Sequence, residues 1–278
     1  MQVILLKDTV IDGSVYWAGT TVETDWPTAH ALERKLIVER ANESDWHDTM
    51  EHFYPDRQAA EVKDVLVFTP VLRLESETVQ AVLGLEWDGA ITFEFQRDNP
   101  ISAQDDPGKK GIANHLHQYT RGRETFLAGR YDAMLVIESD IIPPADALIK
   151  LAALIVDCAY GVYRFRQVDV ISINERYPAP NTNLGSNLSY ERYLLKRAMK
   201  LGQYPCTGGG LGCVLIRRRV LEAIEFRIED LFTAHCDTCF CQDVLRAGFS
   251  QAADMSVVCG HKTPEGEILY PNLDWSTA

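Results

Sequence analysis

The sequence feature that most constrains the fold is a short apolar stretch that ends in two carboxylates. Residues 134–137 read Met-Leu-Val-Ile and run directly into Glu138 and Asp140, after which Pro143 and Pro144 end any regular structure. An apolar run bounded in this way predicts a buried strand of a parallel sheet. Ligands of open α/β sheets bind beyond the carboxyl ends of the strands, which is where both acidic side chains would lie.

The spacing of these two acids indicates a chemistry. Residues i and i+2 of a strand point the same way, so Glu138 and Asp140 would converge if the strand geometry persists. Hard oxygen ligands at a sheet edge suit a divalent cation that also holds phosphate oxygens. Because the motif is short, a second interpretation stays open, in which the acids only mark the end of a strand.

From residue 62 onward, apolar runs alternate with helical patterns. The sequence predicts strands at 64–70, 91–95 and 133–137, and helices at 76–85, 108–130 and 145–158. Ser76 would be the N-cap of the first of these helices. Alternating strands and helices with nearly continuous apolar strands predict a parallel α/β sheet.

The second half of this region is mixed. Short strands are predicted at 161–165, 168–173, 213–216 and 256–259, and helices at 190–200, 218–225 and 238–247. Residues 174–188 are rich in Asn, Pro and Gly, which predicts a loop. A glycine-rich segment, 207–212, is predicted to be a second loop.

The first 61 residues differ from the rest of the chain. Residues 1–45 predict a small β-rich module, with strands at 3–6, 15–17 and 20–23 and a helix at 27–38, and residues 46–61 predict a linker. The module resembles small β-rich modules of bacteriophage proteins, in the pattern Leu-Lys-Asp that begins at Leu6 and the turn Asp12-Gly13. The resemblance implies a phage or prophage origin and a binding or assembly role. An ordinary small β-domain is the alternative.

Composition narrows the classes of partner and compartment. The formal net charge is −13, from 27 Lys and Arg against 40 Asp and Glu. This disfavours a protein that binds by neutralising a nucleic-acid backbone. No apolar run has the length of a membrane span, and no signal peptide is recognised. Seven cysteines without framework spacing predict reduced thiols and a cytoplasmic location, in a bacterial or phage-infected cell.

Cysteines and histidines gather near the end of the chain. His235 and Cys236, Cys239 and Cys241 lie within seven residues, and Cys259 and His261 follow. One interpretation is a zinc site. The other makes Asp237 the important residue, at the N-terminus of a short helix where a carboxylate is stabilised, with the cysteines as small apolar residues on the buried side.

The glycine segment Gly208-Gly209-Gly210-Leu211-Gly212 precedes a predicted strand rather than joining a strand to a helix. It therefore lacks the context of a nucleotide phosphate loop. Such glycines allow a backbone to pass close to a ligand or to adopt positive φ. A flexible turn is the alternative interpretation.

Taken in order, these motifs resemble a GT-A glycosyltransferase of the family 2 pattern over residues 62–262. The resemblance implies an α/β fold with a mixed, mainly parallel sheet flanked by helices, in a domain that spans 62–278. The motifs that carry it are Phe68-Thr69-Pro70-Val71, Arg97-Asp98-Asn99, Glu138-Ser139-Asp140, Gly208-Gly209-Gly210-Leu211-Gly212, Arg217-Arg218-Arg219-Val220-Leu221, Asp237-Thr238-Cys239-Phe240-Cys241, Arg246-Ala247-Gly248-Phe249 and Cys259-Gly260-His261.

The resemblance also implies roles for individual residues. The donor, a nucleotide-diphosphate sugar, would be bound by Thr69, Pro70, Arg97, Asp98, Glu138 and Ser139. A Mn²⁺ or Mg²⁺ ion would be held by Asp140, Glu138 and His261, and the acceptor side would be formed by Gly208, Gly209 and Gly210. Asp237 would be the catalytic base of an inverting hexosyltransferase.

The chain departs from the pattern at two positions. The first acid of the metal motif is Glu138 where the family has Asp, and Cys236 stands where the family has Glu, so only Asp237 transfers as the base.

Two alternatives to a glycosyltransferase remain. One is a non-catalytic phage structural protein that keeps a transferase-like fold to bind a sugar or a nucleotide. The other is a nucleotidyltransferase, although residues 69–73 lack the glycine that its signature requires. The acceptor would be a glycan, a protein or a modified nucleobase, so nucleic acid is expected only as an acceptor substrate. We expect residues 174–205 to contact the acceptor.

Overall fold

The computed structural model describes residues 61–101, 111–166, 171–175, 203–228 and 236–271, together with the backbone of five short strands before residue 41. The helix predicted at 190–200 lies outside the described residues. The same holds for nearly all of the helix predicted at 27–38, of the linker 46–61 and of the loop 174–188.

The N-terminal strands form two small antiparallel sheets. The first has the order β4-β1-β5 and the second pairs β2 with β3. The bounds are β1 Gln2–Leu5, β2 Thr9–Ile11, β3 Ser14–Tyr16, β4 Thr21–Glu23 and β5 Val38–Arg40. Three of these strands overlap those predicted from the sequence, and the division into module, linker and main domain stays a prediction.

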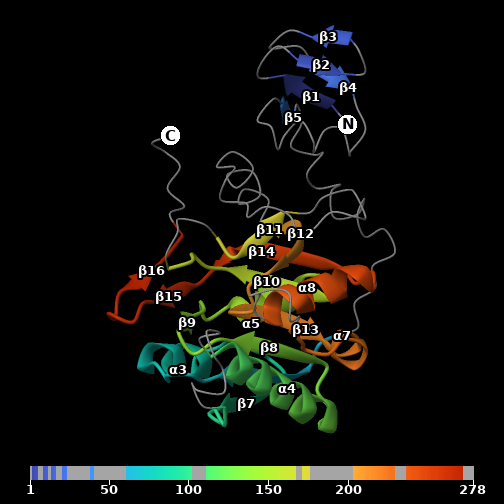
Figure 1. Cartoon of the computed structure of the whole chain (residues 1–278). Helices are drawn as coiled ribbons and strands as arrows, with labels where there is room; N and C mark the ends of the chain where they lie inside the picture. Colours follow the sequence, from blue (N-terminus) through green and yellow to red (C-terminus); the bar gives the residue numbers. More distant parts are fainter. Residues whose placement is uncertain are drawn as a thin grey trace.

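The main sheet has eight strands in the order β11-β12-β14-β10-β13-β8-β6-β7 (Figure 1). The junctions β6–β7, β6–β8 and β10–β14 are parallel and the other four are antiparallel. Followed across the sheet, six strands run in one direction and only β12 and β13 run in the other. The strands are β6 Asp64–Pro70, β7 Ala90–Gln96, β8 Ala133–Ile137, β10 Cys158–Val162, β11 Ile173–Glu175, β12 Gln203–Gly209, β13 Cys213–Arg217 and β14 Gln251–Val258.

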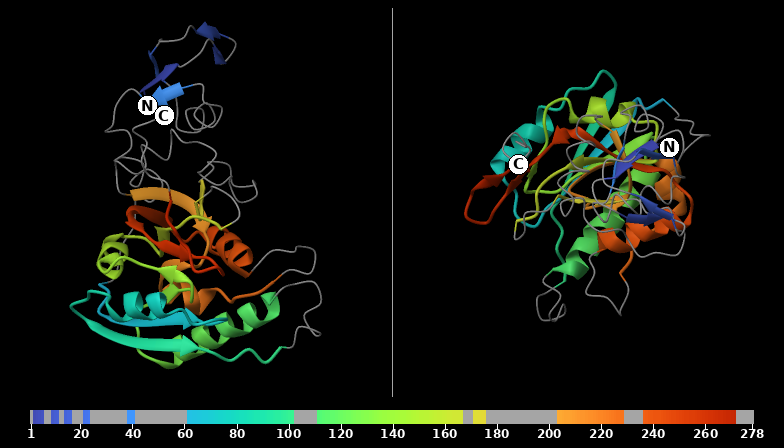
Figure 2. Two further views of the ribbon diagram at one scale, coloured as in Figure 1. Left: turned by 90° about the vertical axis from the view of Figure 1, so that its left-hand side faces the viewer. Right: turned by 90° about the horizontal axis from the view of Figure 1, so that it is seen from above.

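Helices cover both faces of this sheet (Figure 2). Alternate residues of β6 and β8 point to opposite faces. Leu66 and Phe68 pack with α4, α7 and α8, whereas Val65 and Val67 pack with α3 and α5. The helices are α3 Ser76–Leu83, α4 Ile112–Ala128, α5 Ala147–Ala153, α7 Arg218–Ala223 and α8 Cys236–Arg246. The predicted α/β class, with a mixed and mostly parallel sheet flanked by helices, is therefore confirmed.

A second, three-stranded sheet joins distant parts of the chain beside the ends of the main strands. It pairs β15, Gly260–Lys262, with both β9, Ile141–Ile142, and β16, Ile268–Leu269. Its register sets His261 opposite Ile141. This small sheet therefore brings the histidine to the residue that follows Asp140.

Three local predictions are wrong. The helix predicted at 145–158 ends at Ala153, because Cys158 opens β10, which pairs with β13 and β14 far along the chain. The N-cap of α3 is Glu75, without a side-chain cap bond, whereas Ser76 is helical. Gly208 and Gly209 belong to strand β12 rather than to a loop.

Among the described residues, no helix combines the length and the apolar character that crossing a membrane requires.

Candidate functional site

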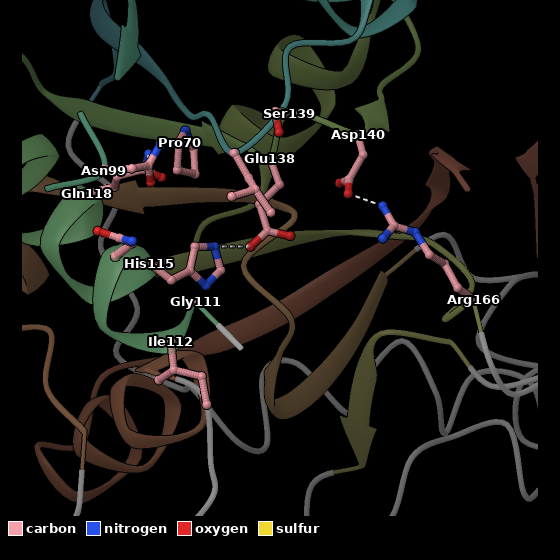
Figure 3. Close-up of a pocket in the computed structure, with 12 residues that line it drawn as sticks. Pro70, Asn99, Gly111, Ile112, His115, Gln118, Glu138, Ser139, Asp140 and Arg166 are labelled. Carbon is pink, nitrogen blue, oxygen red and sulfur yellow. Dashed lines mark hydrogen bonds and ion pairs between the residues drawn. The ribbon is translucent and has the colours of Figure 1, made fainter. Parts of the chain in front are cut away.

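A pocket of about 250 Å³ lies where β6 and β8 end, against the first turns of α4 (Figure 3). It is at the carboxyl edge of parallel strands, as the sequence predicts. Figure 3 places Pro70, Asn99 and Gln118 at one end, Glu138 and His115 in the middle, and Asp140 and Arg166 at the other end. The lining residues are Pro70, Leu72, Asn99, Gly111, Ile112, Asn114, His115, Gln118, Glu138, Ser139, Asp140 and Arg166.

Glu138 lies in the middle of the pocket and is held by α4. Its Oε1 accepts a hydrogen bond from the Tyr119 hydroxyl at 3.0 Å and is 3.1 Å from His115 Nε2. Burial opposes ionisation of Glu138, but the hydrogen bond and charge of His115, with the Tyr119 hydroxyl and the charge of His261, outweigh burial. The pKa of Glu138 therefore lies below its usual value. Burial lowers the pKa of His115, but the hydrogen bond and charge of Glu138, together with the charges of Asp237 and Asp140, outweigh burial and raise this pKa.

Asp140 points away from Glu138 and faces Arg166, with which it forms an ion pair (Figure 3). Its Oδ1 is also 3.9 Å from His261 Nε2. Burial and the nearby charge of Glu138 raise the pKa of Asp140, against the opposing effects of Arg166 and His261. The two carboxylates of the motif therefore have separate partners.

The orientation of His261 is set by the backbone. Its Nδ1 is 2.7 Å from the carbonyl oxygen of Arg164, which can only accept, so Nδ1 carries the proton. In the neutral ring Nε2 then has its lone pair, and this atom faces Asp140. A histidine whose second nitrogen donates to a carbonyl is a common arrangement for a metal ligand.

These two residues could share a divalent ion. Their 3.9 Å separation is shorter than two metal–ligand bonds of about 2.1 Å each. Within the part of the chain that the structure describes, no group of three or more His, Cys, Asp or Glu could hold a metal. Asp140 and His261 could hold an ion only if water or phosphate oxygens supplied its other ligands, and the metal itself, like the role of Glu138 as a ligand, stays a prediction.

Asp237 lies in the first turn of α8, as predicted from the sequence. Its Oδ1 accepts a hydrogen bond from the backbone N–H of Thr238 at 2.6 Å. Its charge contributes to the raised pKa values of His115 and of the buried Tyr119 and Tyr163, after burial and Glu138 for the tyrosines. The carboxylate of Asp237 thus acts on the same residues that surround Glu138.

Not all predicted donor-binding residues line the pocket. Pro70 and Ser139 do, whereas Thr69 is fully buried and its hydroxyl has no hydrogen-bond partner among the described residues. Arg97 and Asp98 are exposed on the loop after β7, where Asp98 lies 3.2 Å from His117. Their roles in binding a base or ribose stay predictions.

The glycines of the predicted acceptor side are required by close packing. A Cβ on Gly208, which has φ of +140°, would lie 2.5 Å from Cys241 Cβ, and one on Gly210 would lie 2.0 Å from the Tyr163 hydroxyl. Gly209 accepts a hydrogen bond from Cys241 Sγ at 3.2 Å. The segment is therefore a tightly packed wall, and its contact with an acceptor stays a prediction.

All seven cysteines are buried and reduced. Burial raises the pKa of Cys236 well above its usual value and that of Cys241 to about 12. Both thiols lie in the apolar cluster beneath α8. These observations agree with the interpretation of the cysteines as small apolar residues.

Sequence reasoning missed the residues that α4 and the segment after β10 bring to the pocket: Asn114, His115, Gln118 and Arg166. The first three recur at i, i+1 and i+4, so they occupy one face of a helix. Since Tyr119 and Phe126 bury a neighbouring face, polar residues beside it were a usable signal. Arg166 had no such signal, because its partner Asp140 is 26 residues away.

The comparisons with known proteins give no assignment. No family model matches the chain, and no curated protein matches it. A solved structure titled "Crystal Structure of A197 from STIV" is similar, with a TM-score of 0.46 and 14% sequence identity, over 76% of this chain and 94% of that one. A similarity of this size carries no argument about function.

Proposed function

We propose that the protein is a metal-dependent glycosyltransferase that moves a sugar from a nucleotide-diphosphate sugar to an acceptor hydroxyl. The observation that carries the proposal is the order of groups along one pocket: amides, then the Glu138 carboxylate, then Asp140 with Arg166. His261 lies behind this end, 3.9 Å from Asp140. A nucleotide-diphosphate sugar presents base, ribose and diphosphate in the same order.

The middle of the pocket suits a ribose. Glu138 is ionised because of His115 and Tyr119, and an ionised carboxylate accepts hydrogen bonds from hydroxyl groups. Only Oε1 has these two partners, so Oε2 is the oxygen for the ribose hydroxyls. Glu138 would then orient the donor rather than bind the metal.

The charged end of the pocket suits a diphosphate. Asp140 Oδ1 and His261 Nε2 would hold Mn²⁺ or Mg²⁺, whose chemistry when bound is to neutralise the charge that grows on the leaving diphosphate. The Arg166 guanidinium can also bind phosphate oxygens, through two parallel N–H donors. Arg166 would thus release the carboxylate of Asp140 and bind the diphosphate of the donor instead.

Asp237 is the proposed general base. It would accept the proton of the acceptor hydroxyl as that oxygen attacks the sugar carbon, which predicts inversion at that carbon. Support comes from its place at the start of α8, in electrostatic reach of His115 and Tyr119. The glycine segment packs against the same helix and would bound the acceptor.

The test is a screen of nucleotide-diphosphate sugars with and without Mn²⁺, read by thermal shift and by release of the nucleoside diphosphate. A ligand at about 100 times its Kd should stabilise the fold by about 2.7 kcal/mol. We expect one donor to stabilise the protein only with Mn²⁺ and to release its nucleotide slowly without an acceptor. No stabilisation by any donor would falsify the proposal.

One observation favours a second candidate, a binder without catalysis. Both carboxylates of the motif already have cationic or hydrogen-bonding partners, Asp140 with Arg166 and Glu138 with His115. A pocket neutralised in this way can bind a sugar nucleotide without a metal. Stabilisation by a donor that is equal with and without Mn²⁺, and with no release of nucleotide, would select this candidate.

A further inference from the structure

The amide end of the pocket contains a glutamine whose orientation is fixed. Gln118 lies on α4 and is 2% exposed. Its Nε2 is 2.9 Å from Val71 O, 3.2 Å from Gln96 O and 3.0 Å from Asn99 Oδ1. Backbone carbonyls can only accept, so a reversed amide would set oxygen against oxygen. The amide nitrogen of Gln118 therefore faces the strand ends.

The neighbouring amide is fixed in the same way. Asn99 Nδ2 donates to Val71 O at 3.0 Å, which leaves Oδ1 as the acceptor for Gln118. The amides of Gln118 and Asn99 and the carbonyl oxygens of Val71 and Gln96 thus form a network that determines the orientation of both amides. Asn99 is a positioning residue for Gln118 in this network.

The remaining polar atom of Gln118 is Oε1. It accepts no hydrogen bond from the described part of the chain, and it is not among the side-chain atoms that are sealed from solvent without a partner. Gln118 also lines the pocket. A side chain that is almost fully buried therefore presents one unpartnered acceptor to the cavity, and a ligand that donates there satisfies it.

We propose that Gln118 is the base-specificity residue, and that its Oε1 accepts the ring N–H of uracil; this inference rests on the proposed function. Uracil has an N–H at ring position 3, whereas cytosine has a lone pair there, which would face the Gln118 oxygen. A site built to pair with an N–H discriminates against a ligand that lacks it.

The test measures the affinities of UDP, N3-methyl-UDP and CDP by calorimetry with Mn²⁺ present, for the wild type and Gln118→Met. We expect the wild type to bind UDP about tenfold more tightly than either of the others, the effect of one hydrogen bond. Gln118→Met should bind all three within about twofold of one another. Gln80→Met, at an exposed position on α3, is the matched control and should keep the wild-type preference.

The outcomes separate this inference from the proposed function. If the wild type binds the three nucleotides equally, or if Gln118→Met keeps the preference for UDP, Gln118 does not read the base, while nucleotide binding itself stands. If no nucleotide binds, the proposed function fails and the inference fails with it. Should Gln118→Met not fold, as judged by circular dichroism, the comparison of UDP with N3-methyl-UDP on the wild type decides.

Discussion

The two edges of the main sheet contain similar charged residues that are used in opposite ways. At the amino edge, the buried Asp157 accepts from the backbone N–H and the hydroxyl of Ser250, both at 2.8 Å, and forms an ion pair with Arg219. Arg217 donates to the carbonyl oxygens of Val156 and Leu154 at 2.7 and 3.1 Å. All of these contacts join one element of the fold to another, and none of them faces the pocket.

At the carboxyl edge, the charged groups face a cavity and have fewer partners. Asp140 has one ion pair, with Arg166, and a histidine nitrogen at 3.9 Å. Gln118 presents an acceptor to the same cavity. The two edges contain the same types of charged residue. What distinguishes the candidate site from the structural scaffold is how many partners within the protein each charged side chain has.

The largest expected effect is at the carboxyl edge. Asp140→Asn removes the anionic oxygen that a cation needs, so we expect nucleotide turnover with Mn²⁺ to fall about 10²–10³-fold while the fold stays intact. Calorimetry of Mn²⁺ and nucleotide binding, with thermal melting alongside, provides the measurement. Asp88→Asn, at an exposed turn, is the control. Turnover within threefold of wild type would remove Asp140 from the site.

The next effect is at the amino edge, where we expect a loss of stability without a loss of nucleotide binding. Asp157→Ala leaves the buried N–H of Ser250 without its acceptor and Arg219 without its carboxylate, so we expect a loss of about 3 kcal/mol of unfolding free energy. Urea denaturation measures it, with Asp88→Ala as the exposed control. Nucleotide affinity should not change under folding conditions. A loss of affinity with intact stability would break the distinction between the two edges.

A smaller effect sharpens the role of Arg166. In Arg166→Ala the competing cation leaves Asp140, so we expect Mn²⁺ alone to bind more tightly and the nucleoside diphosphate to bind about tenfold more weakly. The two changes have opposite signs, which a simple loss of structure does not produce. Arg121→Ala, at an exposed position on α4, serves as control. If both affinities fall together, Arg166 is part of the scaffold.

The smallest effect concerns pH and a pair away from both edges. The hydrogen bonds from Arg227, at 2.6 and 2.9 Å, lower the pKa of Asp243 on α8 below 3.8, against an opposing effect of burial. A lowered folded-state pKa gives stability that is present above the unfolded pKa and is lost as the pH falls through the folded one. We expect Asp243→Asn to lose about 1 kcal/mol at pH 7 and to approach the wild type below about pH 4. Denaturation at several pH values tests this, and a constant difference would contradict it.

The elements with unbroken apolar runs were predictable from the sequence. β8 matches its prediction at both ends, because residues 133–137 are completely buried and Glu138 and the prolines limit the strand. β10 was predicted only in part, because the strand expected at 161–165 covers only its last two residues. Cys158 to Val162 become a strand by pairing with β13 and β14, 50 or more residues away. Local periodicity carries no information about such pairing.

The sequence predicted where the site lies, but it did not predict which residues contact one another there. The sequence placed Glu138 and Asp140 beyond a strand end, and the pocket is there. We expected both side chains to converge on the assumption that the strand continues through Asp140. Instead, the chain turns at Ser139 and Asp140. Glu138 therefore reaches α4, and Asp140 reaches Arg166.

The packing of Gly210 against Tyr163 restricts the order in which this chain can evolve. A methyl group at residue 210 would lie 2.0 Å from the tyrosine hydroxyl, and the ring of Tyr163 contacts that of His261 edge-on with centroids 5.4 Å apart. Alanine at 210 would thus force the tyrosine ring to move, and this ring contacts the histidine that faces Asp140. If Tyr163→Phe comes first, the hydroxyl is absent and the same alanine meets less resistance. Whether a lineage accepts one substitution therefore depends on whether it already carries the other.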